Sequence, residues 1–434
     1  MPSNPSEHSL PPEAEIRFDI GATGALKHMS ELFARHGDIY RLYMPARRRY
    51  AYVIHRPEDV KRVLVTNHRN YIKGVDRDRI RVLLGLGIMT SEGALWQRQR
   101  RMMQPLFHRR VVQYFGQLID GANDRLIARW TDIASNARTI NLTEEMSEFI
   151  LEIILRALFG SRAERVLEPF SFVAKSAARD LQFVYKFRAL IPLVAEVIHE
   201  RRTDGNRGEP SDYLDLLAGL EDRESDTVMN ERQLIDEIMT LVVAGHETTA
   251  SVLNWTWYLL SQHPAVEARL VDELNRNQFA APATLEQVES ISYAGQVLNE
   301  AMRLYPPGWL LSRRTISSDS LCGYSIPAGA DVLLPLYLVH RHPRYWENPD
   351  QFDPDRFSSA RESEHPRFAF VPFAAGPRHC IGESLALYEM LMHVSKVVPH
   401  FRMRLIDDQP IELEAQINLR ARYPLMMRIS PRCR

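Results

Sequence analysis

The chain has 434 residues, of which 45% are hydrophobic and 25% are charged, as in an ordinary globular protein. That profile excludes a disordered chain, a collagen-like chain and a small disulfide-rich scaffold. Lys plus Arg number 54 and Asp plus Glu number 55. The resulting net charge of −1 disfavours a nucleic-acid-binding protein, which usually carries a basic excess.

The cysteines and the apolar stretches of the chain indicate its cellular compartment. Cys322, Cys380 and Cys433 lie too far apart for a CxxC pair or a zinc knuckle, and a sparse, odd count suits a reducing compartment. The first twenty residues show no cationic segment followed by an apolar core, so no signal peptide is predicted. The uncharged stretch 248–262 falls short of the ~18–20 residues that a membrane span needs. We therefore expect a soluble, cytoplasmic protein without a membrane anchor.

The first elements are an arm and a hairpin. Residues 1–15 are rich in Pro, Ser and Glu, which predicts a flexible N-terminal arm. Residues 40–44 and 49–55 flank Pro45 and Ala46, and this pattern predicts a β-hairpin. Over residues 57–277 apolar side chains recur at three- and four-residue spacing, which predicts helices.

One of these helices is unusually long. Asn230 and Gln233 have the spacing of a capping box, and the helical pattern continues to about Gln262. Some ~32 residues at ~1.5 Å each would form a rod of ~48 Å. Pro264 then stands where the next helix would begin.

The last third of the chain mixes helices with short strands. A helix is predicted over residues 293–304, and the segments 321–326 and 331–336 around Pro327-Ala328-Gly329 predict a second hairpin. Residues 342–379 have no sustained period and predict a long ordered loop, and a helix over 381–398 precedes a short β region. The predicted fold is mainly α with a minor β portion and no clean domain boundary.

The most informative stretch ends the long loop and contains a cysteine. It reads Phe373-Ala-Ala-Gly376-Pro-Arg378-His-Cys380-Ile-Gly382. The two glycines allow a close backbone approach, and a thiolate just before a helix is stabilised by the helix N-terminus. A single thiolate suits an axial haem ligand better than a zinc or iron–sulfur site. A buried structural cysteine is the alternative.

This stretch is similar to the haem-ligand signature of the cytochrome P450 family, F-x-x-G-x-R-x-C-x-G. The resemblance covers about residues 30–430. It implies a triangular α-rich body with a small β-rich lobe, formed by residues 16–434 as one domain. It also implies haem b, bound non-covalently with the Cys380 thiolate on iron, and the motif residues Phe373, Gly376, Arg378, Cys380 and Gly382 as cofactor-binding residues.

A second motif is Glu300-Ala-Met-Arg303. Alone it is weak, because an i,i+3 ion pair on a helix surface is common and contributes only tenths of a kcal/mol. In the family the pair is buried and joined by an Arg from a Pro-x-Arg-Phe segment, which residues 354–357 match with Arg356. The resemblance implies that Glu300, Arg303 and Arg356 lock the loop that holds the ligand.

A third motif, Ala244-Gly245-His246-Glu247-Thr248-Thr249, lies in the middle of the long helix. A polar cluster inside an apolar rod is hard to explain by packing alone. The stretch resembles the family's oxygen-activation motif. Ala244 and Gly245 would then let the flat cofactor and O₂ lie against the backbone, Thr248 would donate a hydrogen bond to the oxygen, and Glu247 would relay protons. His246 is interpreted as polar filler.

A fourth motif concerns the haem propionates. Trp96 and Arg100 stand one helical turn apart, and alone this spacing indicates only a Trp–Arg stack. By resemblance they hold a propionate together with Arg378 and Arg313, although Arg314 is a close alternative to Arg313. Three cations would balance two buried carboxylates. Four further arginines form either a solvated face or the docking surface of an electron donor: Arg98, Arg101, Arg109 and Arg110.

The implied reaction inserts one oxygen atom from O₂ into an organic substrate, with two electrons from separate proteins. The expected partners are a ferredoxin or flavodoxin with its NAD(P)H reductase, and the protein is expected to be a monomer. The rivals are a haem-thiolate isomerase, dehydratase or peroxygenase, against which Thr248 and Glu247 argue, and a non-catalytic haem sensor.

The substrate is predicted only by class. Segments that resemble the family's recognition regions are apolar with scattered arginines, so we expect a lipophilic molecule, with an acidic group as one option. These segments are residues 71–89, 170–197, 241–249, 308–312 and 416–419, and the arginines are Arg77, Arg179 and Arg188.

Overall fold

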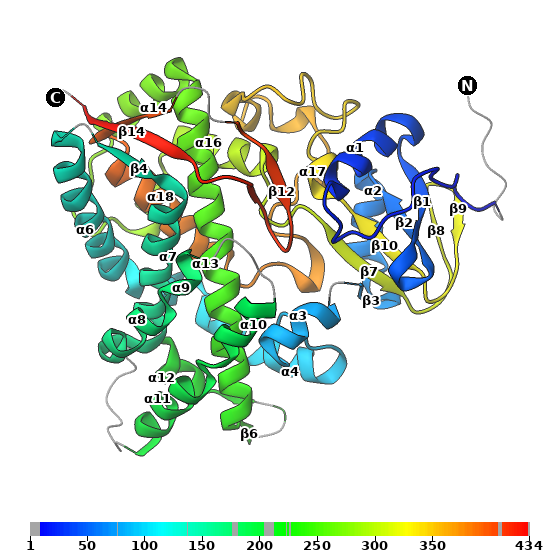
Figure 1. Cartoon of the computed structure of the whole chain (residues 1–434), viewed down its shortest axis with the longest axis horizontal. Helices are drawn as coiled ribbons and strands as arrows, with labels where there is room; N and C mark the ends of the chain where they lie inside the picture. Colours follow the sequence, from blue (N-terminus) through cyan, green and yellow to red (C-terminus); the bar gives the residue numbers. More distant parts are fainter. Residues whose placement is uncertain are drawn as a thin grey trace. The chain divides into compact units, whose positions relative to one another are not determined.

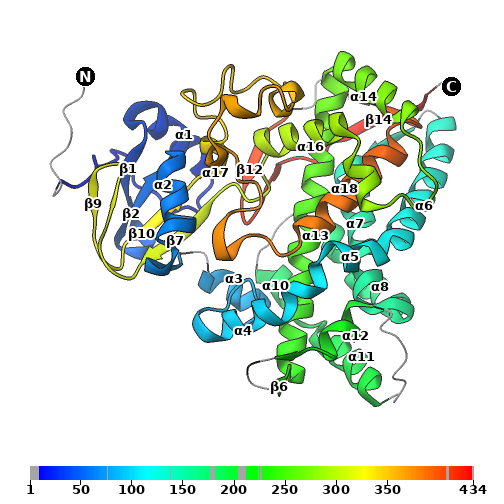
Figure 2. The same ribbon diagram turned by 180° about the vertical axis from the view of Figure 1, so that it is seen from behind.

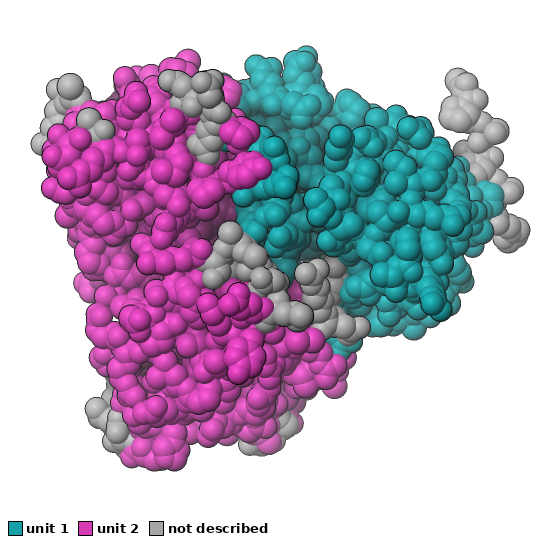
Figure 3. Space-filling model, viewed as in Figure 1, with its two compact units in different colours: residues 1–77, 299–380, 411–422 teal, residues 78–298, 381–410, 423–434 magenta. Residues whose placement is uncertain are grey.

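The computed structural model describes residues 9–75, 77–136, 138–175, 181–203, 212–222, 224, 227–406 and 410–432. The chain forms two compact units, coloured separately in Figure 3. Unit 1 comprises residues 1–77, 299–380 and 411–422, and unit 2 comprises residues 78–298, 381–410 and 423–434. Helices contain far more of the described residues than the short strands do, so the mainly α fold with a minor β portion is confirmed.

A five-stranded sheet organises unit 1 (Figure 1). Its strand order is β1-β2-β10-β7-β3. The predicted first hairpin is confirmed, because β1 (Ile39–Met44) pairs antiparallel with β2 (Arg49–Ile54). The other strands are β10 (Asp331–Leu334), β7 (Leu311–Thr315) and β3 (Tyr71–Lys73).

The two faces of this sheet carry separate apolar clusters, as the two-residue period of a strand dictates. Leu42, Val53 and Leu333 pack with helix α1 (Ala25–His36) on one face. Ile54 and Leu334 pack on the other face with helix α2 (Pro57–Lys61), the following helical segment η2 (Arg62–Thr66) and Val371. The second face therefore receives the loop that leads to Cys380.

The second predicted hairpin is wrong. Its first segment is itself a hairpin, in which β8 (Asp319–Leu321) pairs with β9 (Tyr324–Ile326) across Cys322-Gly323. Both turn residues have positive φ, 52° and 82°, as a tight hairpin turn requires. β10 instead pairs parallel with β2 and antiparallel with β7. All four β10 residues are buried, and this suits a central strand better than one arm of a surface hairpin.

The segment expected to be a flexible arm, residues 1–15, is described from residue 9 onward. Within it the Pro12 carbonyl accepts a hydrogen bond from the Arg41 N–H, and the Ala14 N–H donates to the Arg41 carbonyl. Because β1 is an edge strand with unpaired backbone groups, this part of the chain lies against the sheet. Only residues 1–8 of the expected arm lie outside the described residues.

Helix α13 (Glu231–Gln262) is the longest element of unit 2, and the predicted capping box of Asn230 and Gln233 is confirmed at its start. Helices α7 (Leu142–Phe159) and α18 (Glu383–Val397) pack against it, and α6 (Gly116–Ser135) packs against both of these at the outer edge of the unit, as Figures 1 and 2 show. Helix α14 (Pro264–Arg276) begins at Pro264 as predicted. Among the described residues, none of the helices has the length and apolar character needed to cross a membrane.

The remaining elements are shorter. In unit 2 the helices are α3 (Arg77–Leu84), α4 (Gly93–Met103), α5 (Arg109–Val112), α8 (Glu164–Phe170), α9 (Phe172–Lys175), α10 (Leu181–Arg188), α11 (Ile191–Thr203), α12 (Tyr213–Ala218) and α15 (Leu285–Glu289). Strands β4 (Thr139–Asn141), β11 (Phe401–Leu405) and β14 (Met426–Pro431) form one small sheet, and β5 (Glu221–Asp222) pairs with β6 (Thr227–Val228). Unit 1 adds α17 (Leu336–Val339), β12 (Leu413–Ala415) and β13 (Leu419–Ala421), and α16 (Ser292–Leu304) runs from unit 2 into unit 1.

Candidate active site

The Cys380 loop is closed by its own backbone. The Cys380 N–H donates to the Phe373 carbonyl over 2.9 Å, and the His379 N–H donates to the Gly376 carbonyl over 3.0 Å. Cys380 is exposed and forms no disulfide, although free cysteine is among the most buried residue types in proteins. The loop therefore holds an accessible cysteine two residues before Gly382, which is the N-cap of α18.

Gly376 and Gly382 are required, or tolerated, for different physical reasons. A Cβ at Gly376 would lie 1.9 Å from the Leu64 carbonyl oxygen, and its φ is +72°, so packing against η2 requires glycine there. A Cβ at Gly382 would meet no described atom within 4 Å, and its φ is negative. Space beside Gly382 and an accessible cysteine are what a flat, thiolate-ligated cofactor requires, so these residues fit haem.

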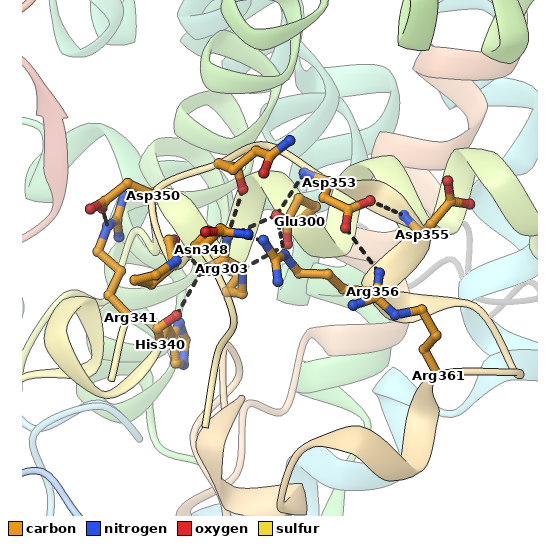
Figure 4. Close-up of polar contacts among 12 residues, drawn as sticks. Glu300, Arg303, His340, Arg341, Asn348, Asp350, Asp353, Asp355, Arg356 and Arg361 are labelled. Atoms are coloured by element: carbon orange, nitrogen blue, oxygen red, sulfur yellow. Dashed lines mark hydrogen bonds and ion pairs between the residues drawn. The ribbon is translucent and has the colours of Figure 1, made fainter. Parts of the chain in front are cut away.

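Glu300, Arg303 and Arg356 come together in unit 1 (Figure 4). Arg303 Nε and Nη2 donate to the two Glu300 carboxylate oxygens over 2.7 and 2.8 Å, and Arg356 Nε donates over 3.3 Å. The side chains of Glu300 and Arg303 have no exposed surface, and that of Arg356 is 5% exposed. The surface-pair interpretation of E-x-x-R is therefore excluded.

Two cations face one carboxylate in this cluster, and backbone carbonyls compensate for the excess positive charge. Arg303 Nη1 donates to the carbonyls of His340 and Pro349, and Arg303 Nη2 donates to that of Gln351. Arg356 Nη2 donates to a fourth carbonyl, that of Asn348. The cluster thus links the end of α16 to the loop residues 340–356, as the labelled residues of Figure 4 show.

His340 connects this cluster to the Cys380 loop. Its carbonyl accepts from Arg303, and its ring Nε2 accepts the Val371 N–H over 3.1 Å. Complete burial lowers the pKa of His340 to about 3, so the ring is neutral and able to accept. Val371 lies two residues before Phe373. No sequence pattern predicted this link, since it joins segments 31 residues apart.

On α13, Ala244 and Thr248 share one face, and the Thr248 hydroxyl donates to the Ala244 carbonyl over 2.7 Å. Thr248 is half-buried, whereas Thr249 is buried. A Cβ at Gly245 would lie 2.8 Å from Ile154 Cδ1, so the packing of α7 accounts for that glycine. A cofactor role for Gly245 stays a prediction.

His246 faces α7 and has a structural role. Its ring Nε2 lies 2.8 Å from the Ser147 hydroxyl and 3.0 Å from the Ser147 carbonyl, and the residue is buried. The interpretation of His246 as polar filler is confirmed.

The predicted propionate residues occupy α4, β7 and the Cys380 loop. Trp96 and Arg100 lie one turn apart on α4, where Arg100 Nε donates to Gln104. Arg314 forms an ion pair with Asp331 over 2.8 Å, whereas its neighbour Arg313 is buried and projects to the opposite face of β7. Arg314 is thus engaged within the sheet, and the choice of Arg313 for a haem propionate stays a prediction. Arg378 ends the short helical turn Gly376–Arg378 and is half-buried.

The four further arginines of unit 2 form ion pairs for the most part. Arg101 binds Asp222 over 2.8 Å, Arg98 donates to Thr227 and lies 3.5 Å from Asp222, and Arg109 binds Glu289. Arg110 is exposed. Three of the four thus serve the structure of unit 2, although each remains partly accessible.

Cys322 is not a site candidate. Cys322 Sγ donates to Asp59 over 2.9 Å, and burial raises its pKa, so it is a passive protonated thiol. Cys433 and Arg179 lie outside the described residues.

A sequence model of the family described as Cytochrome P450 matches residues 17–187 and 165–426 of the chain. The chain belongs to the cytochrome P450 family.

Named relatives and solved structures agree with this assignment. Cyclooctatin synthase of Streptomyces melanosporofaciens is 31% identical over 92% of this chain and 89% of the relative, and cyclooctat-9-en-7-ol 5-monooxygenase of the same organism is 30% identical over 93% of each. Pentalenene oxygenase of Streptomyces avermitilis is 29% identical over 94% and 93%. The heme domain of cytochrome P450DA superposes with a TM-score of 0.85 at 24% identity over 98% of each chain, and shows the same fold.

As a cytochrome P450, the protein is a haem-thiolate monooxygenase, an oxidoreductase that uses O₂. The family carries iron in haem, and this class of enzyme takes electrons from redox partners and oxidises a lipophilic substrate. The Cys380 loop belongs to unit 1, whereas α4 and α13 belong to unit 2.

Proposed function

We propose that Cys380 is the axial thiolate of this cytochrome P450 and that residues 16–434 act as one monooxygenase domain. The observation that carries the proposal is the exposed Cys380 on a backbone-closed loop, which His340 links to the buried cluster of Glu300, Arg303 and Arg356. The N-terminus of α18 favours the thiolate form of a cysteine placed just before it.

Haem, when bound, supplies the electron-rich iron at which O₂ is cleaved. The residues of the chain bind, orient and deliver protons. We assign Thr248 and Glu247 to proton delivery, since a hydroxyl both donates and accepts and a carboxyl can exchange a proton with water. We assign Trp96, Arg100, Arg313 and Arg378 to the propionates.

We propose a lipophilic olefin as substrate. The names of the relatives refer to pentalenene and to cyclooctat-9-en-7-ol, and other relatives from Arabidopsis thaliana include carotene epsilon-monooxygenase, 28% identical over 92% of this chain. An acidic group has less support, because Arg188 donates to the backbone carbonyl of Val82.

We propose a ferredoxin or flavodoxin with its NAD(P)H reductase as the electron source, docking where Arg110 and the neighbouring arginines remain accessible. The exposed carboxylates of such a carrier would complement these cations. We propose the cytoplasm as the compartment, because the cysteines of the chain are sparse and odd in number.

The ligand assignment is tested by the spectrum of the reduced protein with carbon monoxide. We expect the red-shifted Soret band of thiolate-ligated haem, its loss in Cys380→Ser, and its retention in the matched controls Cys322→Ser and Cys433→Ser. A red-shifted band in Cys380→Ser would refute the assignment.

The reaction type is tested by stoichiometry. With surrogate redox partners and a lipophilic olefin, O₂, NAD(P)H and oxygenated product should change in equal amounts. Product formation without O₂ consumption would favour an isomerase or dehydratase, and a haem protein without turnover would favour a sensor. Dependence on added peroxide alone would indicate a peroxygenase.

A further inference from the structure

The segment 85–91 connects α3 to α4 and overlaps the region 71–89, which resembles a substrate-recognition segment of the family. Two consecutive acidic residues of α13 bind its backbone. Asp236 Oδ2 accepts the Leu86 N–H over 2.8 Å, and Glu237 Oε2 accepts the Ile88 N–H over 2.9 Å. From α4, Gln99 Nε2 donates to the Leu86 carbonyl over 2.7 Å. The segment is therefore held from two helices, which lie side by side in Figures 1 and 2.

Two glycines allow this close approach. A Cβ at Gly85, whose φ is +67°, would lie 2.4 Å from a carboxylate oxygen of Asp236. A Cβ at Gly87 would lie 2.1 Å from the Thr240 hydroxyl and 2.7 Å from the Asp236 carbonyl oxygen. A side chain at Gly87 would meet the α13 backbone and move the segment away from the helix, whereas one at Gly85 would displace the Asp236 carboxylate and strain a positive-φ backbone.

Burying the Glu237 carboxyl at this position costs free energy. It has no exposed surface, and its second oxygen, Oε1, has no hydrogen-bond partner among the described residues. Burial raises its pKa to about 8, and the neighbouring Asp236, which is paired with Arg232 over 3.2 Å, adds to that shift. A buried carboxyl with one unpaired oxygen costs more than an apolar side chain of similar size. Core packing therefore does not explain it.

The position of Glu237 on α13 suggests what the contact achieves. Glu237, Leu241, Ala244 and Thr248 follow one another at spacings of four, three and four residues, so they share one face of the helix. Leu241, Ala244 and Thr248 are half-buried, whereas Val242 on another face is buried. This face is thus partly exposed from Thr248 to Leu241, and Glu237 with segment 85–91 closes its far end, ~10 Å along the axis from Ala244.

We propose that Glu237 is a positioning residue for substrate recognition: it fixes Ile88 and Met89 at the end of the α13 face and so sets how long a lipophilic substrate the enzyme accepts. This inference rests on the proposed function, because it takes Thr248 as the reacting end of that face. Ile88 and Met89 are half-buried apolar residues, as a wall that contacts an apolar molecule requires.

The test uses ferric holoenzyme and two iron-binding probes, imidazole and N-dodecylimidazole, titrated by the shift of the Soret band. Imidazole needs only the iron, whereas the dodecyl tail must also extend past the reacting centre. Glu237→Leu leaves the Ile88 N–H without its acceptor, and Gly87→Ala displaces the segment from its other side. An unpaired buried donor should lower the population of the fixed segment by about tenfold or more. We therefore expect the affinity for N-dodecylimidazole to change ~10-fold, in either direction. Binding of imidazole should change less than ~2-fold.

Two variants complete the design. Glu237→Gln keeps an oxygen acceptor for Ile88, so both affinities should return to within ~2-fold of the wild type. Gly295→Ala, in a helix where a Cβ meets nothing within 4 Å, is the matched glycine control and should change neither affinity.

Unchanged binding of N-dodecylimidazole in both Glu237→Leu and Gly87→Ala, or equal changes for both probes, would overturn the inference. If Glu237→Leu does not fold, Gly87→Ala decides alone. A wild-type protein whose Soret band does not respond to imidazole would instead refute the proposed haem-thiolate function, so the two failures are distinguishable.

Discussion

Replacing Glu300 by Ala should destabilise the segments that its carboxylate joins and cause loss of haem or of folded protein, not a clean kinetic defect. The carboxylate accepts four hydrogen bonds: two from Arg303, one from Arg356 and one from the Asp353 N–H. Its removal leaves two buried guanidiniums without a counter-charge. Their four bonds to backbone carbonyls remain, but these carry only partial charge.

The expected magnitude follows from burial. Breaking a buried ion pair on one side costs ~3–5 kcal/mol, because it leaves an uncompensated charge in a low dielectric. Here neither Glu300 nor Arg303 has any exposed surface, so solvent does not screen the loss. Since folded domains have total stabilities of about 5–15 kcal/mol, such a loss is a large fraction of the whole.

The assay is urea unfolding of the purified protein, together with the haem-to-protein absorbance ratio. The matched control is Glu164→Ala, which removes an equally short ion pair, 2.9 Å from Arg156, whose glutamate is 72% exposed. That control should lose less than about 1 kcal/mol. Glu300→Ala with full haem and a stability within about 1 kcal/mol of the wild type would refute the reasoning.

Three further predictions follow from local geometry. Thr248→Val should leave haem binding and NAD(P)H consumption intact, while product formation falls and hydrogen peroxide formation rises. Thr249 is rotated ~100° toward the packed side of the helix, so Thr249→Val should keep NAD(P)H consumption coupled to product formation. The reverse pattern would show that the motif is shifted by one residue. Gly376→Ala should abolish the thiolate-type carbon monoxide spectrum, because its Cβ would collide with the Leu64 carbonyl oxygen. A normal spectrum would contradict the packing of Gly376 against Leu64. The folded-state pKa of Glu237 lies above its ordinary value, so the folded protein binds an extra proton between about 4.5 and about 8. The unfolding free energy of the wild type relative to Glu237→Gln should therefore fall as pH rises through that window, and a difference independent of pH would argue against a buried, protonated carboxyl.

Features set by a few neighbouring residues were predictable from the sequence. The capping box at Asn230, the start of the next helix at Pro264 and the first hairpin all depend on contacts within a few positions along the chain, and the structure contains each of them. The spacing around Cys380 likewise identified a loop that presents a thiol, because its closing hydrogen bond spans only seven residues.

Features that join distant segments were decided only by the tertiary structure. The partners of β10 depend on which strands lie beside it, so local turn residues suggested the wrong hairpin. Arg313 and Arg314 are indistinguishable until Asp331, on the neighbouring strand, pairs with one of them. Glu237 offered one signal, a charge inside an apolar stretch of helix, but its partner Ile88 lies 149 residues away. The sequence by itself determined the chemistry and the local geometry of this protein. Tertiary contacts decided which polar groups are buried and with what they pair, because the cost of burying a charge depends on neighbours that only the folded chain brings together.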